Sequence, residues 1–172
     1  MYRRLDRYED ESLGLPYPVV LLDGVEEEID DETGERVGIS IPHLEDLVAT
    51  VAIARVLRPL QLSGAEVKFI RRVIGRSAKD FAAALHMAPE TYSRWENGKQ
   101  AVGEWADKQV RLAAIVVLRE KVARLNADVD AVVNMQIQPS TADELPYLEI
   151  RLVHGEGLDN HDREAWDLKL AA

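Results

Sequence analysis

The 172-residue chain contains no cysteine and carries a deficit of positive charge, with 21 Lys and Arg against 31 Asp and Glu. The lack of cysteine excludes disulfides, thiol catalysis and thiolate zinc sites. No apolar run approaches the roughly 18 residues of a membrane span, and the segment Met1–Asp6 lacks the apolar centre of a signal peptide. These absences favour a soluble, cytoplasmic protein. The apolar fraction of 47% is sufficient for a packed core.

Motifs for catalysis and for cofactors are also absent. The chain has no nucleophile elbow, no phosphate-cradling glycine loop and no paired-acid motif. One loop gathers two histidines and two carboxylates without a known ligand spacing: His154, Asp159, His161 and Asp162. We therefore expect no enzyme activity, no metal and no cofactor, with a metal or catalytic role for this loop as the remote alternative. His43 and His86 are expected to be a strand-end residue and a turn residue.

The negative charge is unevenly distributed. Residues 1–46 hold four arginines and fourteen acids, a net charge of −10, whereas residues 63–103 hold seven basic and four acidic residues, a net charge of +3. Affinity for nucleic-acid phosphates depends on the local charge of the docking face. The basic segment is therefore compatible with DNA binding if the acidic remainder points away from the duplex.

Residues 63–99 predict three short helices separated by turns. Ser63 followed by Glu66 forms a capping-box pattern, and the first helix stops at Gly75. Ser77 caps a second helix, which ends in the turn 86–88. Pro89 then suits the first turn of a third helix, which Gly98 ends. The order and spacing are typical of a helix-turn-helix that reads DNA.

The third helix is expected to bury Tyr92 and Trp95 and to present polar side chains outward. Arginine can donate to guanine and glutamate can accept from cytosine in the major groove. The predicted base-contacting residues are Pro89, Glu90, Ser93 and Arg94. The predicted phosphate-contacting residues are Arg76, Ser77, Lys79, Thr91, Asn97 and Lys99. The alternative is a helical module that contacts another protein as an adaptor and does not bind DNA.

The segment Leu62–Val102 resembles the lambda-repressor and Cro type of helix-turn-helix domain, often called XRE. The resemblance lies in Pro89, Glu90 and Thr91 and in the run Ser93–Lys99. It implies base contacts from Glu90, Ser93 and Arg94, and phosphate contacts from Asn97 and Lys99. The family usually has glycine in the turn where this chain has His86, so a small shift of that turn is expected.

A weaker resemblance extends upstream. The run from 14–17 through 23–25, then 38–41, Leu44 and 62–66, is similar to MqsA-like antitoxin regulators. That group implies a toxin protein as a possible partner and autorepression of the operon. The zinc-binding module that often precedes the helix-turn-helix in that group cannot form here, because the chain has no cysteine.

The N-terminal region predicts a β-hairpin followed by a helix. Strands are expected near 17–29 and 35–41, with Thr33-Gly34 as the turn signal within an acidic stretch. That stretch is read as a solvated hairpin rather than a cation site. A helix is then expected from Pro42 until Pro59 breaks it. Its apolar residues lie on one stripe, and we expect this stripe to pack against the helix-turn-helix.

A long helical stretch beginning at Trp105 carries a near-heptad apolar seam. Its members are Leu112, Ile115, Leu118, Val122, Leu125, Val129 and Val132. We favour a partner helix in a homodimer, and the alternative is that the seam packs on its own domain. Alternating strands are expected at 147–153 and 165–170, and they should join either the N-terminal hairpin or a second subunit.

The predicted fold is mainly α with added β. Its predicted regions are 1–42 (acidic hairpin), 43–103 (helix-turn-helix), 104–134 (long helix, possibly dimerising) and 135–172 (C-terminal strand pair). The predicted function is a sequence-specific transcriptional regulator that binds double-stranded DNA, most simply a homodimeric repressor at a near-palindromic operator. An autorepressing antitoxin and a protein-interaction adaptor remain the alternatives.

Overall fold

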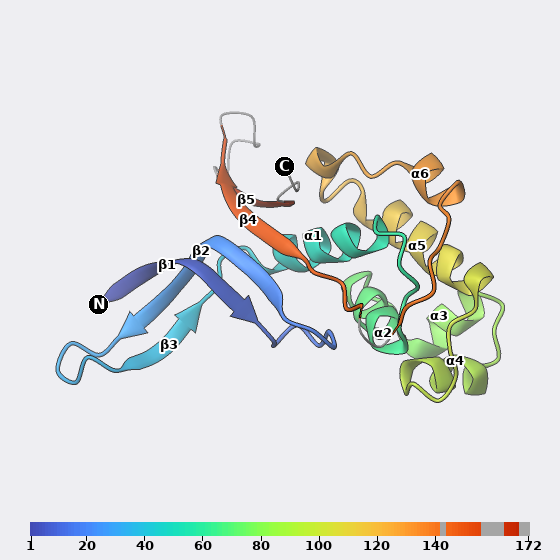
Figure 1. Ribbon diagram of the computed structural model, residues 1–172, viewed down its shortest axis with the longest axis horizontal. Coiled ribbons are helices and arrows are strands. Elements are labelled where there is room, and N and C mark those ends of the chain that lie inside the picture. Colours follow the sequence, from blue (N-terminus) through green and yellow to red (C-terminus); the bar gives the residue numbers. More distant parts are fainter. Residues whose placement is uncertain (142–143, 156–163, 169–172) are drawn as a thin grey trace.

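The computed structural model describes residues 1–141, 144–155 and 164–168 (Figure 1). The described strands are β1 Tyr2–Asp10, β2 Val19–Ile29, β3 Arg36–Ser40, β4 Glu149–His154 and β5 Glu164–Leu168. The described helices are α1 Leu44–Val56, α2 Gly64–Val73, α3 Ala78–Ala84, α4 Pro89–Glu96, α5 Glu104–Leu118, the 3₁₀ turn η1 Ala123–Leu125, and α6 Val129–Val133. The prediction of a helical core with added strands is confirmed.

One mixed sheet joins the two ends of the chain. Its strand order is β1-β2-β4-β5, with β3 also paired to β2. Strand β2 is antiparallel to β1 and β3 but parallel to β4, which is antiparallel to β5. The C-terminal strands therefore add to the N-terminal hairpin of the same chain, the first of the two arrangements expected. Strand β1 was not predicted from the sequence.

The acidic stretch between β2 and β3 is a tight turn. The Asp30 carboxylate accepts hydrogen bonds from the backbone N–H groups of Glu32 and Thr33, at 3.0 and 2.7 Å, and from the Thr33 hydroxyl. These bonds, led by those of Thr33, lower the pKa of Asp30 below its ordinary value. Gly34 supplies the positive φ of 70° that the turn requires. The interpretation as a solvated hairpin agrees with this geometry.

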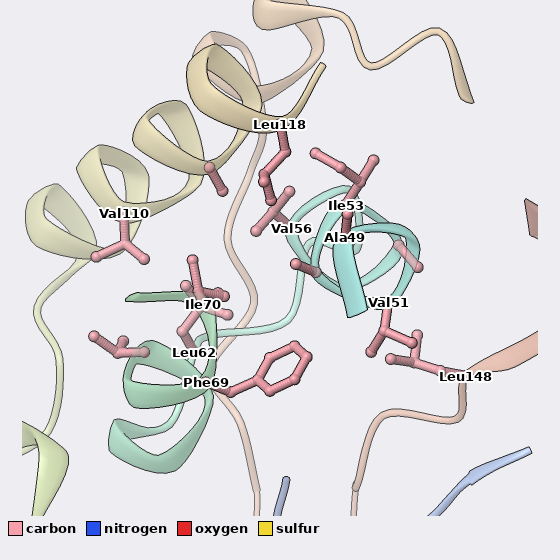
Figure 2. Packing of buried hydrophobic residues seen from close by; sticks show 14 of the residues in the cluster. Ala49, Val51, Ile53, Val56, Leu62, Phe69, Ile70, Val110, Leu118 and Leu148 are labelled. Carbon is pink, nitrogen blue, oxygen red and sulfur yellow. The ribbon is translucent and has the colours of Figure 1, made fainter. Parts of the chain in front are cut away.

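Helix α1 is enclosed by the rest of the fold, because the sheet lies on one side of it and α2 and α5 on the other. Figure 2 shows Val51 pointing toward Leu148 before β4, whereas Val56 lies beside Leu118 of α5. Every residue from Ala49 to Val56 is buried. The expectation of a single apolar stripe was therefore too narrow. His43 is the N-cap of α1, with φ 50°, rather than a strand-end residue.

Helix α5 is shorter than the helix predicted from the apolar seam Leu112–Val132. Helix α5 ends at Leu118, and Val122, Leu125 and Val132 lie on the turns and on the short α6 that follow. Arg124 draws this segment back onto α1 and β5 by donating to the Asp46 carboxylate, the Thr50 hydroxyl and the Trp166 carbonyl. A continuous seam to Val132 is therefore wrong, and Ile115, Leu118, Val122 and Val132 are fully buried in their own chain.

Two buried arginines hold the link between α1 and α2. Arg55 binds the Glu66 carboxylate and donates to the carbonyls of Leu60 and Gln61, at 2.9 and 3.1 Å. Arg111 pairs with Asp107 and donates to the carbonyls of Val56, the last residue of α1, and of Arg58 and Leu60 in the link. Since all four charged side chains are buried, their hydrogen bonds offset the cost of desolvation.

Glu66 also connects the sheet to the helices. Its carboxylate accepts a 2.6 Å hydrogen bond from the Tyr17 hydroxyl, which lies just before β2. Burial opposes ionisation of Glu66, but hydrogen bonds from Arg55, Ser63 and Tyr17 outweigh it and lower the pKa of the carboxyl. The carboxylate is therefore ionised at neutral pH and holds three segments of the chain together.

Replacing Glu66 with glutamine should destabilise the protein strongly, because the buried Arg55 guanidinium would lose its counter-charge. Breaking one partner of a buried pair costs about 3–5 kcal/mol. We expect this loss in the free energy of unfolding measured by urea denaturation. Glu32→Gln, at an exposed position in the hairpin, should change it by less than about 0.5 kcal/mol. Equal midpoints for the two variants would contradict the role of Glu66.

Candidate nucleic-acid interface

The first two helices of the interface begin at the predicted caps. The Ser63 hydroxyl accepts from the Glu66 N–H at 3.3 Å, and the Glu66 carboxylate accepts from the Ser63 N–H at 2.7 Å, which completes the capping box. The Ser77 hydroxyl accepts from the Asp80 N–H at 3.1 Å and starts α3. Gly75 takes a φ of 76° after α2, as expected of a helix stop.

His86 makes the turn into α4 in the conformation usually left to glycine. Its φ is 53°, and the backbone N–H groups of His86 and Met87 donate back to the carbonyls of Ala83 and Ala82. These bonds satisfy the last carbonyls of α3. The histidine therefore takes the strained left-handed conformation itself, and α4 begins at Pro89 as predicted.

Helix α4 is attached through its two aromatic residues. Tyr92 and Trp95 are buried, as predicted, and the Tyr92 ring meets Phe81 of α3 edge-on at a centroid distance of 5.8 Å. Gly64 of α2 lies directly against the Trp95 backbone, so that a Cβ added there would lie 1.6 Å from the Trp95 carbonyl oxygen. The backbones of α2 and α4 therefore approach as closely as glycine allows.

A charged pair fixes the other end of α4. Arg71 of α2 donates to both carboxylate oxygens of Glu96, at 2.7 and 3.2 Å, and to the carbonyl of Arg76 at 2.8 Å. The Tyr92 hydroxyl donates to Glu96 at 2.7 Å. Partial burial opposes ionisation of Glu96, but the bonds from Arg71 and Tyr92 prevail and lower its pKa. Neither Arg71 nor Glu96 was predicted as a positioning residue, because the two lie 25 positions apart.

The predicted base-contacting residues share the outer side of α4. Pro89, Glu90, Ser93 and Arg94 are all exposed. The Asn97 side chain, predicted to meet phosphate, donates to the Ser93 carbonyl at 2.8 Å and so satisfies a carbonyl in the last turn of α4. Since Ser93 and Arg94 follow Tyr92 directly, the buried aromatic residues set the direction in which this face points.

The predicted phosphate-contacting residues lie at both ends of the same unit. Arg76, Ser77 and Lys79 are exposed at the start of α3, and Asn97 and Lys99 are exposed after α4, whereas Thr91 is half-buried. The Ser77 hydroxyl is already engaged, since it donates to the Asp80 carboxylate at 2.7 Å. The contacts to bases and phosphates remain predictions.

The second candidate site lies largely outside the described residues. Asp159, His161 and Asp162 belong to the part of the chain that is not described. His154 lies 3.2 Å from one carboxylate oxygen of Glu164, and His43 lies 3.6 Å from the other. Within residues 1–141, 144–155 and 164–168, no cluster of three or more such side chains has the arrangement of a metal site.

A comparison with protein families gives a match within this part of the chain. Residues 68–103, from within α2 to the N-cap of α5, match the family model described as Helix-turn-helix. The matched family is a DNA-binding one, and the resemblance to XRE domains is thereby confirmed for this segment. No curated protein and no solved structure matches the chain. The similarity to antitoxin regulators stays a prediction.

Among the described residues, no helix is both long and apolar enough to cross a bilayer.

Gly64→Ser should displace α4 and destabilise the protein, because the added side chain would collide with the Trp95 backbone. Overpacking of this kind costs about 1–3 kcal/mol, and DNA affinity should fall with it. Gly103→Ser is the matched control, since a Cβ at Gly103 meets no atom within 4 Å and serine suits the N-cap of α5. Thermal unfolding of both variants distinguishes them, and identical melting would refute the close contact.

The Arg71–Glu96 pair should make stability depend on pH. Because the pKa of Glu96 is lower in the folded state, its contribution is present above the ordinary value of 4.5 and is lost as pH falls through the folded value. Glu96→Gln should therefore be less stable than the parent at pH 7, and the difference should shrink in acid. Urea denaturation from pH 7 to 3 measures this, with the exposed Glu35→Gln as control. A constant difference would contradict the assignment.

Proposed function

Because residues 68–103 form a helix-turn-helix DNA-binding domain of the XRE type, we propose that this protein is a sequence-specific transcriptional regulator. It acts in the cytoplasm as a homodimeric repressor that occupies an operator. Two recognition helices related by a two-fold axis would meet successive major grooves about 34 Å apart. The operator is then a near-palindrome.

The observation that carries the proposal is the fixed, polar outer face of α4. Its inner side is held by Tyr92 and Trp95 in the core and by Glu96 bound to Arg71. A helix held in this way presents Glu90, Ser93 and Arg94 in a defined direction without further ordering. Arg94 can donate to O6 and N7 of guanine, and Glu90 can accept from N4 of cytosine.

The distribution of charge supports the same orientation. The segment 63–103 carries a net charge of +3, whereas residues 1–46 carry −10. Figure 1 shows that the arm formed by β1, β2 and β3 extends at the opposite end of the molecule from α3 and α4. The acidic strands therefore lie far from the proposed DNA surface, which limits their repulsion of phosphate.

The direct test is DNA binding by the full chain. Fluorescence anisotropy should show preference for the intergenic DNA upstream of the protein's own gene over a scrambled duplex, with affinity that falls as salt increases. A footprint on that DNA should reveal two related half-sites. Equal affinity for both duplexes would contradict sequence-specific regulation.

Arg94→Ala should reduce affinity for the preferred duplex by about 1–3 kcal/mol and leave non-specific binding nearly unchanged, because a base contact accounts for the difference between the two. Lys99→Ala should weaken binding to both duplexes alike, as expected for a phosphate contact. Arg36→Ala, exposed on β3 at the far end of the molecule, should change neither. Anisotropy titrations measure all three, and an equal loss on both duplexes for Arg94→Ala would assign it to the backbone.

A further inference from the structure

A hollow of about 270 Å³ lies between α3 and α5. Its wall on α3 consists of Phe81, Ala84 and Leu85. Its wall on α5 consists of residues that recur at helical spacing: Gln109, Leu112, Ala113, Val116 and Val117. The two valines are 59% and 39% exposed, so the hollow opens to solvent. Figure 1 shows both helices at the end of the molecule opposite the arm of β1, β2 and β3. Exposed apolar surfaces of this kind mark binding sites on soluble proteins.

A single positive charge stands beside this apolar surface. Among the described residues that line the hollow, Arg76 is the charged one and Gln109 the uncharged polar one. Arg76 is exposed in the turn between α2 and α3, and its guanidinium has no hydrogen bond or ion pair with another described residue. Asp80, one helical turn further on, accepts from the Ser77 hydroxyl instead. The hollow therefore combines an apolar lining with a cation that lacks a partner among the described residues.

We propose that the hollow binds a small aliphatic carboxylate, of the size of a medium-chain fatty acid, and that this ligand releases the protein from DNA. The carboxylate pairs with the Arg76 guanidinium and accepts from the Gln109 side chain, while the aliphatic tail lies between α3 and α5. The proposal rests on the DNA-binding function proposed above and names a regulator of that same surface.

The charge of the lining selects the class of ligand. A lone cation beside an apolar surface is complementary to one anionic group on an apolar body, which is the usual combination in small-molecule sites. No acidic side chain belongs to the described lining of the hollow, so none repels an anion there. Carboxylic acids are ionised at neutral pH and supply the required charge.

The size of the hollow favours a small molecule over a protein. Its volume of about 270 Å³ lies just below the roughly 300–1,000 Å³ of most ligand pockets, which indicates a short tail. Ten residues line it, whereas a standard protein interface takes about 20–30 residues on each side. The tail of a medium-chain acid is therefore a better match than a helix of a second chain.

Occupancy of the hollow competes with DNA for Arg76. This arginine is one of the predicted phosphate contacts, and Ser77 and Lys79 lie close to it in sequence at the start of α3. A carboxylate bound to the guanidinium removes one positive charge from that surface, and phosphate affinity falls with it. By thermodynamic linkage, ligand and DNA each weaken the binding of the other by the same factor.

Isothermal titration calorimetry with octanoate, in the absence of DNA, tests the site. The parent should bind one octanoate per chain. Ala84→Leu should weaken binding by about tenfold or more, because the larger side chain takes the space of tail methylenes that each contribute up to about fourfold. Ala83→Leu is the matched control, since Ala83 is exposed on the same helix but does not line the hollow. No binding by the parent, or equal binding by the two variants, would overturn the proposal.

Octanol isolates the role of the charge, because it has the same tail without a carboxylate. The parent should prefer octanoate by about fivefold, the upper range for an exposed ion pair. This preference should vanish in Arg76→Gln and persist in Arg72→Gln, at an exposed arginine outside the lining. A preference for octanoate that survives in Arg76→Gln would contradict the assigned position of the carboxylate.

Fluorescence anisotropy connects the site to DNA. Octanoate should raise the dissociation constant of the preferred duplex by about 5- to 150-fold, the usual range of coupling between sites, and should have no effect on Arg76→Gln. Octanoate that binds without changing DNA affinity would overturn the release. Since the calorimetry uses no DNA, a chain that binds octanoate but no duplex would refute the regulator function while supporting the site.

Sedimentation of the same variants distinguishes the remaining occupant. Self-association that is lost in Ala84→Leu and kept in Ala83→Leu, in a chain that binds no octanoate, would assign the hollow to a second copy and overturn the proposal. Equal sedimentation of the two variants, together with octanoate binding by the parent, supports the small ligand.

Discussion

The fold depends on two buried guanidinium groups, each paired with a carboxylate and hydrogen-bonded to backbone carbonyls. Arg55 and Arg111 are fully buried, and together they bind two carboxylates and the carbonyls of the link between α1 and α2. A link of this length would otherwise bury backbone groups without partners. The arginines therefore allow α2 to start in the middle of the molecule, and every later helix of the DNA-binding unit takes its position from α2.

A series of close contacts links these arginines to α4. Glu66 joins Arg55 and Tyr17, Gly64 abuts the Trp95 backbone, and Arg71 holds Glu96. These contacts all originate from a single helix, α2, and reach Tyr17, just before β2, on one side and α4 on the other. The N-terminal strands and the DNA-binding unit therefore share one packed core, although the net charges of the two segments differ in sign.

The sequence predicted what is determined locally and missed what is determined at a distance. The caps at Ser63 and Ser77, Pro89 and the buried pair Tyr92 and Trp95 act within a few residues, so the helix-turn-helix and its outer face followed from them. Strand β1 was missed because six of its nine residues are charged and show no alternation, and a charge such as Arg3 gains its partner, Glu27, only from β2. The end of α5 was missed because Arg124 turns the chain through contacts with Asp46 and Trp166, both far away in sequence.

The pairing of β2 with β4 has a consequence for synthesis of the chain. Val20, Leu21 and Leu22 meet their parallel partners only when residues 149–151 have been made, after the whole DNA-binding unit. During translation the helices can form first, while one edge of β2 still presents free N–H and C=O groups beside apolar side chains. Such edges recruit other strands. A chain that stops before residue 149 therefore keeps helices α2 to α4 but leaves this edge of β2 unpaired, and β4 covers the edge once it has been made.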